Sequence, residues 1–265
     1  MTVAFRALLV IALAVTVAFL TLPIVAIFVD VGLGELLESL DDPASLDALR
    51  LSLETTVIAL VIIVVVGTPA AYLLATRSFP GRAGVVTLIE LPLILPPAAA
   101  GIGLLAALGP NGLIGSQLDA LGITLPLTTA GVVVALVFVA SPFYIRQAQA
   151  GFASLDRTLL EASSTLGAPE GRTFARVAIP LALPSLGTGA ALAWGRALGE
   201  FGATLMFAGS FRGVTQTAPL AIFEQLSTDF PAALALSAVL VAASAVLLLG
   251  VKLLIGRGGR VSAFG

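Results

Sequence analysis

The sequence predicts an all-α integral membrane protein with six membrane-spanning helices, because it is strongly apolar and its apolar runs are long. Hydrophobic residues make up 58% of the 265 residues and charged residues 11%, whereas soluble domains carry roughly 25% charged residues. The mean hydropathy is +1.11. Several apolar runs reach the ~20 residues that a helix needs to cross about 30 Å of hydrocarbon. We predict spans at 7–29, 51–76, 85–108, 128–148, 187–209 and 230–255, which with a loop at 149–186 form one membrane domain over 1–265.

The first predicted span is expected to be a retained helix rather than a cleaved secretory signal. It follows Arg6, as a signal would, but its apolar run continues to Val29, past the 7–15 residues of a signal core. The chain has no cysteine and no histidine. Thiolate, disulfide and serine–histidine chemistry are therefore excluded, and the sequence also lacks the Gly-x-Ser-x-Gly pattern. These absences argue against an intramembrane serine protease.

The positions of the basic residues predict the orientation in the membrane. Lys and Arg near span ends are retained on the cytoplasmic side, and ten of the thirteen basic residues fall at ends that share one side. We therefore expect both termini and the 149–186 loop to be cytoplasmic, in a cell membrane. The ten are Arg6, Arg77, Arg82, Arg146, Arg157, Arg172, Arg176, Lys252, Arg257 and Arg260.

The first external loop is instead acidic, with Arg50 as its one basic residue. Its six carboxylates are Asp30, Glu35, Glu38, Asp41, Asp42 and Asp47. An acidic surface does not attract anions by charge, so we interpret the loop as a solvated surface rather than a binding site.

The cytoplasmic segment after the fourth span is predicted to hold two short helices. Asp156 can cap the first by accepting from free N-terminal amides, with Leu155 and Leu160 as a hydrophobic staple around it. Gly167 is expected to end this helix, since glycine adopts the left-handed conformation without steric cost.

The second helix is expected to begin at Pro169 and to be only about ten residues long. A proline in the first turn loses no hydrogen bond, and Glu170 complements the positive end of the helix dipole. Arg176 complements the opposite end. Pro180 and Pro184 are expected to terminate the helix.

This segment resembles the EAA loop of ABC importer permeases, whose pattern is Glu-Ala-Ala, three residues, Gly, nine residues, Ile, any residue, Leu-Pro. Glu161-Ala-Ser163, Gly167 and Val177-Ala-Ile-Pro180 keep that spacing with conservative changes. The resemblance implies a coupling helix at about 168–178 that sits in a groove of an ATPase subunit. The alternative is an amphipathic loop with accidental spacing. The residues that the resemblance assigns to ATPase coupling are Glu161, Ala162, Gly167, Ala168, Pro169, Glu170, Gly171, Arg172 and Phe174.

Two charges, Arg196 and Glu200, lie inside the fifth predicted span. A central charge costs at least ~2.5–3.5 kcal/mol, so such residues face a partner, a cavity or a pathway. Their spacing of four places them on one helical face, where they can pair. Pairing and lining a translocation path are compatible, and both stay open. Gly195 and Gly199 add a small-xxx-small pattern that permits close helix contact between two copies.

Two further places are candidates for a path or gate. Pro96 and Pro97 interrupt the third predicted span, which indicates either a gate or an ordinary kink. The external segment with Thr215, Gln216 and Thr217 offers polar donors that can receive an oxyanion, or it is a polar loop.

The fifth span and the segment after it resemble the sulfate, molybdate and tungstate branch of these permeases, most closely the molybdate type. The resemblance rests on Gly199-Glu-Phe-Gly-Ala-Thr204, Met206-Phe-Ala-Gly209 and Thr215-Gln-Thr-Ala-Pro-Leu220. It implies alternating access in a homodimer that works with two ATPase subunits and an external solute-binding protein. Molybdate or tungstate is the expected substrate, with sulfate as the alternative.

Energy is expected to come from another chain. The single lysine, Lys252, follows Val251, so no Gly-Lys-Ser/Thr phosphate loop exists. We expect no catalytic site, metal or cofactor in this chain, with ATP and Mg²⁺ bound by the partner ATPase. The lipid bilayer is an expected partner and nucleic acid is not. An ion-gradient-driven secondary transporter remains the alternative from a different class.

Overall fold

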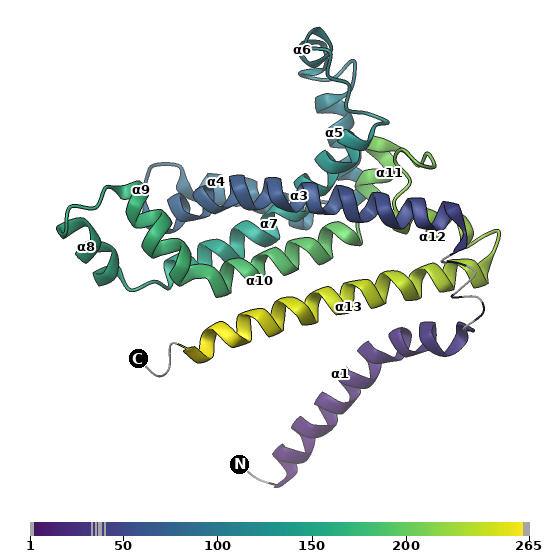
Figure 1. Cartoon of the computed structure of the whole chain (residues 1–265), viewed down its shortest axis with the longest axis horizontal. Helices are drawn as coiled ribbons and strands as arrows, with labels where there is room; N and C mark the ends of the chain where they lie inside the picture. The colour runs from purple at the N-terminus through teal and green to yellow at the C-terminus, as the bar shows by residue number, and fades with distance from the viewer. Residues whose placement is uncertain (1–2, 33, 35, 37–38, 40, 262–265) are drawn as a thin grey trace.

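The structure is a computed structural model that describes residues 3–32, 34, 36, 39 and 41–261. Glu35 and Glu38 of the predicted acidic loop lie outside these residues. The described part of the chain is built of helices and contains no strand, which confirms the predicted fold class (Figure 1). Its longest helices are α1 (Val3–Asp30), α3 (Pro43–Thr76), α7 (Thr129–Ala153), α10 (Ile179–Leu198) and α13 (Phe230–Val261). The others are α4 (Arg82–Ile94), α5 (Pro97–Leu108), α6 (Gly115–Ala120), α8 (Arg157–Thr165), α9 (Glu170–Thr173), the π-helix η1 (Phe174–Ala178), α11 (Gly202–Ala208) and α12 (Ala218–Gln225).

Five helical segments in the described residues are long and apolar enough to cross a membrane. They are Ala4–Asp30, Pro43–Thr76, Thr129–Ala153, Glu170–Leu198 and Phe230–Gly250. A sixth span exists if the bent pair α4 and α5 is counted as one. In Figure 1, α8, α9 and the last turns of α13 lie toward one end of the bundle, and α11 and α12 lie toward the other.

The third predicted span is not one helix, because the chain bends by 119° between α4 and α5. Leu95 and Pro96 each precede a proline and are extended, with ψ of 132° and 133°. The proline ring clashes with a helical conformation of the residue before it, so two successive prolines break the helix here. Each half is about 18–20 Å long at 1.5 Å per residue, too short to cross the hydrocarbon alone.

The packed centre of the bundle is α7, which lies between α3 and α10. Tyr144 of α7 is almost fully buried, and its hydroxyl lies 2.6 Å from Thr68 Oγ1 of α3. A Cβ on Gly67 of α3 would lie 2.9 Å from the Tyr144 ring, and one on Gly189 of α10 would lie 3.2 Å from it. Two glycines thus let both neighbours approach this tyrosine closely, and its buried hydroxyl is satisfied.

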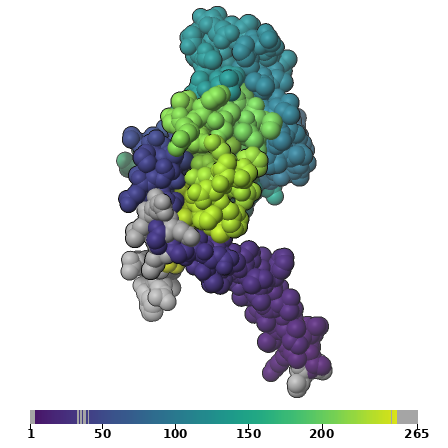
Figure 2. Space-filling model, turned by 90° about the vertical axis from the view of Figure 1, so that its right-hand side faces the viewer, coloured from purple at the N-terminus to yellow at the C-terminus, as the bar shows by residue number. Residues whose placement is uncertain are grey.

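Among the described residues, α1 contacts the rest of the chain near its C-terminal end, where Ile27 and the following Val31 pack with Leu234, Ala235 and Ala238 of the last helix. Nearly all the remaining side chains of α1 are exposed, and Figure 2 shows the helix extending away from the body. An apolar helix with this much open surface requires lipid or another chain to cover it.

Candidate functional site: a two-helix loop and two charge pairs

The first helix of the predicted docking loop is confirmed as α8. Asp156 Oδ1 accepts from the Thr158 amide at 2.9 Å, and the Thr158 hydroxyl adds a second bond. These hydrogen bonds to the charged form lower the pKa of the Asp156 carboxyl. The helix ends as predicted, because Gly167 follows with φ of +78°. Leu155 and Leu160 pack against the group of buried apolar side chains that includes Tyr144 and Phe152 of α7. This contact fixes α8 to the bundle.

The second helix does not stop at Pro180 or Pro184, and this prediction was wrong. α9, η1 and α10 form one continuous helix from Glu170 to Leu198. The Ile179 amide donates to Phe174 O, which is the wider i to i−5 spacing of a π-helix. Widening the helix just before Pro180 accommodates a ring that cannot donate to the preceding turn. Pro169 also lies one position earlier than expected, as the residue before the first helical one.

The predicted coupling residues divide into an exposed set and an anchor. All but two of the nine are exposed; Ala168 and Phe174 are half-buried. The Phe174 ring lies 4.8 Å from the ring of Tyr72 and 6.3 Å from that of Phe152, so it holds the loop against α3 and α7. Within the chain Phe174 thus makes an anchoring contact, and its role at a partner surface stays a prediction. Ser163 Oγ and Thr173 Oγ1 lie 2.9 Å apart and join α8 to α9.

Sequence reasoning missed Leu166, whose side chain is 88% exposed at the end of α8. A large apolar side chain so open beside exposed Gly167 and Pro169 fits a surface that another protein covers. The sequence feature that could have identified Leu166 is its position directly before Gly167, the glycine that ends the helix.

A cavity of about 590 Å³ lies between the ends of α3 and α7 and the loop helices α8 and α9. Tyr72, Leu160 and Glu161 are part of its lining. Arg77, at the end of α3, forms an ion pair with Glu170, the first residue of α9. The loop is thus tied to α3 by an ion pair and by the aromatic contact of Phe174.

Arg196 and Glu200 form the ion pair that their spacing predicted, with Nη2 and Oε2 2.5 Å apart. The Glu200 side chain is 1% exposed and that of Arg196 is 26% exposed. The fifth predicted span, however, is broken: α10 ends at Leu198, and α11 begins at Gly202. Glu200 Oε1 accepts from the Ala203 amide at 2.7 Å and so satisfies a free donor at the start of α11. Glu200 therefore holds both the break and the arginine in place.

The two broken spans pack against each other through α5 and α11. A Cβ on Gly101 would lie 2.6 Å from Ala203 O, and one on Gly202 would lie 2.8 Å from Pro97 Cβ. A Cβ on Gly195 would meet nothing within 4 Å. The close contact predicted for Gly195 and Gly199 thus does not occur with another helix of this chain, and their contact with a second copy stays a prediction.

The side chains of Thr215, Gln216 and Thr217 are buried and are not exposed to solvent as free hydrogen-bond donors. Thr215 Oγ1 accepts from the Phe211 amide at 2.9 Å, and the Gln216 side chain donates to Glu224. Thr217 is 3% exposed, and its hydroxyl has no hydrogen-bond partner among the described residues. Thr215 and Gln216 thus bond within the turn between α11 and α12, as a polar loop would, and contact of this segment with an oxyanion stays a prediction.

Sequence reasoning also missed a second charge pair, between Glu90 of α4 and Arg146 of α7. Arg146 Nη1 lies 2.5 Å from Glu90 Oε1, and the side chains are 53% and 35% exposed. Arg146 was assigned to the end of the predicted span 128–148, and α7 continues about 10 Å beyond it, to Ala153 at 1.5 Å per residue. Both residues fall within predicted spans, and two opposite charges inside spans were the sequence feature that could have predicted the pair.

The chain matches the family described as binding-protein-dependent transport system inner membrane component over residues 67–257. This range contains the predicted docking loop, both charge pairs and both broken spans. The chain belongs to this family of ABC permeases. It is a multi-pass protein, and the family description places such components in the inner membrane.

Curated relatives of this permease carry two kinds of name. The molybdenum transport system permease protein ModB of Mycobacterium tuberculosis is 42% identical over 235 residues, which cover 89% of each chain. The sulfate transport system permease protein CysT of Escherichia coli is 36% identical over 224 residues, covering 84% of this chain and 81% of CysT.

Solved ABC transporters share the fold of this permease at low sequence identity. A bacterial transporter involved in the import of alginate aligns with a TM-score of 0.76 at 16% identity, covering 96% of this chain and 95% of that chain. The methionine transporter MetNI, in an inward-facing conformation, aligns with a TM-score of 0.61 at 18% identity, covering 79% of this chain and 94% of that chain.

Proposed function

We propose that this permease carries a tetrahedral oxyanion, molybdate or tungstate, inward by alternating access driven by a separate ATPase. The observation that carries the mechanism is the continuous helix from Glu170 to Leu198. One end of it is the exposed docking loop, and the other end holds Arg196 beside a break in the span. A force applied at α9 therefore reaches the charged break through one rigid element.

The proposed substrate follows from the relatives. ModB, named for molybdenum, is more similar to this chain than CysT, named for sulfate, at 42% against 36% identity. Sulfate, which is also a tetrahedral oxyanion, remains the second candidate. A solute-binding protein on the outer side is expected to select between these anions.

The proposed assembly contains two copies of this chain, two ATPase subunits and the external binding protein. Its orientation places α8, α9 and both termini in the cytoplasm, as the positions of the basic residues predict. ATP and Mg²⁺ belong to the ATPase, and this chain supplies the path and the docking surface.

The docking assignment is tested by replacing residues 167–172 with a Gly-Ser linker of equal length and purifying the chain with its ATPase. We expect loss of the complex and of transport-coupled ATP hydrolysis. Replacing Glu54 by Gln, on the exposed face of α3, is the matched control and should leave both intact. If the linker variant still forms the complex and keeps transport-coupled ATP hydrolysis, the docking assignment is wrong.

The substrate is tested by calorimetric titration of the associated solute-binding protein with molybdate, tungstate and sulfate. Tight binding of the first two is expected, and tight binding of sulfate alone would transfer the proposal to sulfate. Uptake by vesicles that lack any ATPase, driven by a proton or sodium gradient, would instead support a secondary transporter.

A further inference from the structure

The two charge pairs lie at different heights along the same pair of packed helices, and all four of their residues fall inside predicted spans. α7 and α10 are antiparallel: a Cβ on Gly151 would lie 2.4 Å from Ser185 Cβ, and one on Gly189 would lie 3.1 Å from Gln147 Cβ. In this register, Arg146 lies level with the residue after Gly189, and Arg196 lies six residues further along α10. The backbones of the two arginines are thus separated by ~9 Å along the helix axes, with Arg146 nearer the predicted docking loop.

The faces that carry these pairs cannot be lipid-facing at low cost. Charged side chains at membrane depth almost always face protein or a water-filled cavity. Both members of the Glu90–Arg146 pair are partly exposed in this chain, as is Arg196. We therefore place the uncovered sides of α4, α7 and α10 along the anion path.

The two pairs differ in how firmly their carboxylates are held. Glu200 is buried, and its second oxygen accepts from the Ala203 amide, so it stays with Arg196. Glu90 is on α4, which has no buried residue and packs mainly on α7. α4 also ends at the 119° bend. A movement of α4 can separate Glu90 from Arg146 without breaking a packed core.

A guanidinium freed in this way is suited to an oxyanion. It carries five N–H donors in a planar fork that matches two oxygens of a carboxylate or a similar anion. Glu90 is the one carboxylate within ion-pair distance of Arg146 in the described residues. We propose that Arg146 is a second contact for the transported oxyanion, masked by Glu90 while α4 lies against α7 and exposed when α4 moves. This inference rests on the proposed function and assigns a residue to its inner path.

The test is equilibrium binding of radiolabelled molybdate and sulfate to the purified permease–ATPase complex without nucleotide. Glu90→Gln removes the masking charge and should increase affinity for one of the anions by about tenfold or more. The double variant Glu90→Gln with Arg146→Gln should lose that gain. Glu54→Gln, which removes the charge of an exposed helical pair, should bind as the wild type does.

A purely structural role gives a different pattern. If the pair only fastens α4 to α7, Glu90→Gln and Arg146→Gln will each lower thermal stability, or raise basal ATP hydrolysis, by the same amount. Neither variant will then gain affinity for an anion. A gain that persists without Arg146 would also overturn the proposal. Should Glu90→Gln fail to assemble, Glu90→Asp keeps the charge on a shorter stem and should give a smaller gain in the same direction.

Failure of this inference is distinguishable from failure of the proposed function. Wild-type complex in proteoliposomes with the solute-binding protein tests ATP-driven oxyanion uptake without reference to Glu90. If uptake occurs and the Glu90→Gln gain is absent, only the role of Arg146 is lost.

Discussion

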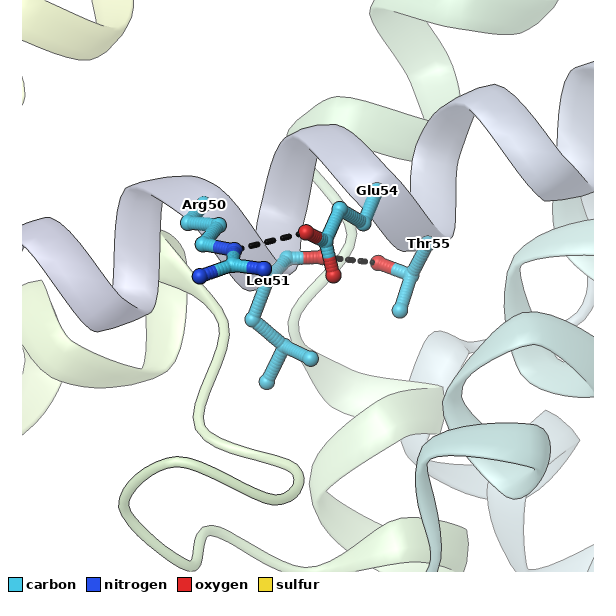
Figure 3. Close-up of polar contacts among 4 residues, drawn as sticks. All are labelled: Arg50, Leu51, Glu54 and Thr55. Atoms are coloured by element: carbon cyan, nitrogen blue, oxygen red, sulfur yellow. Dashed lines mark hydrogen bonds and ion pairs between the residues drawn. The ribbon is translucent and has the colours of Figure 1, made fainter.

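The chain contains two Arg–Glu pairs with the same helical spacing in opposite surroundings. Arg50 and Glu54 lie on the outer face of α3, 2.7 Å apart and 78% and 52% exposed (Figure 3). The Glu200 side chain, 2.5 Å from Arg196, is only 1% exposed. An exposed i, i+4 pair contributes roughly 0.3–0.5 kcal/mol, whereas removing one partner of a buried pair costs about 3–5 kcal/mol. Spacing therefore predicts that two residues pair, and the surroundings determine how much free energy is lost when one of them is removed.

Truncating the acidic member of each pair should give the largest contrast. Glu200→Ala leaves Arg196 without its partner and removes the acceptor of the Ala203 amide, so we expect a loss of about 3–5 kcal/mol of stability or failure to assemble. Glu54→Ala should cost about 0.5 kcal/mol or less. Thermal unfolding of the detergent-solubilised permease measures both, and equal effects would contradict the comparison.

Replacing Arg196, the basic member of the buried pair, separates an effect on transport from an effect on structure. Arg196→Met keeps an unbranched side chain at the break while removing the charge, so transport should fall more than assembly does. Uptake by proteoliposomes and recovery of the intact complex give the two measurements. Equal loss of both would mean that Arg196 has only a structural role.

The same contrast between packed and open surroundings applies to two glycines of α5. A methyl group on Gly101 would overlap the backbone of Ala203 at 2.6 Å, whereas a Cβ on Gly103 meets nothing within 4 Å. Overpacking costs typically about 1–3 kcal/mol, so Gly101→Ala should destabilise the permease. Gly103→Ala should be neutral or slightly stabilising, because alanine is the better helix former. The difference in melting temperature between the two variants tests the α5–α11 contact.

The smallest expected effect is the pH dependence of an exposed cap. The folded pKa of Asp156 is lowered from 3.8 by its bonds from Thr158, so its stabilising effect is present above pH 3.8 and is lost as the pH falls through the folded pKa. Asp156→Asn keeps a capping acceptor that does not titrate. The wild type should therefore lose stability relative to this variant only below about pH 4, measured by thermal unfolding across pH 3–7.

Local features of this chain were predictable from its sequence. The cap at Asp156, the end of α8 at Gly167 and the pairing of Arg196 with Glu200 each depend on residues within one or two turns. Spans were predictable because apolar length is set by the bilayer.

Features that depend on distant parts of the chain were missed. The Glu90–Arg146 pair joins residues that come together only when α4 packs on α7. Burial of Thr215 and Gln216 depends on the fold around α12. Pro180 signals the end of a helix by every local rule, and only the π-helical turn before it explains why the helix continues.

That π-helical turn also holds an extra residue in the helix that carries the loop. It contains one residue more than an α-helical turn, and each residue of an α-helix rotates the next by about 100°. A π-helical turn completes about the same rotation with one residue more, so deleting one residue between Phe174 and Ala178 should leave the direction of α9 nearly unchanged. Deleting one residue from the regular part of α10 should instead swing α9 around the helix axis by about 100°. Complex formation by these two variants with the proposed ATPase partner would test whether that partner depends on the direction of the loop as well as on its residues.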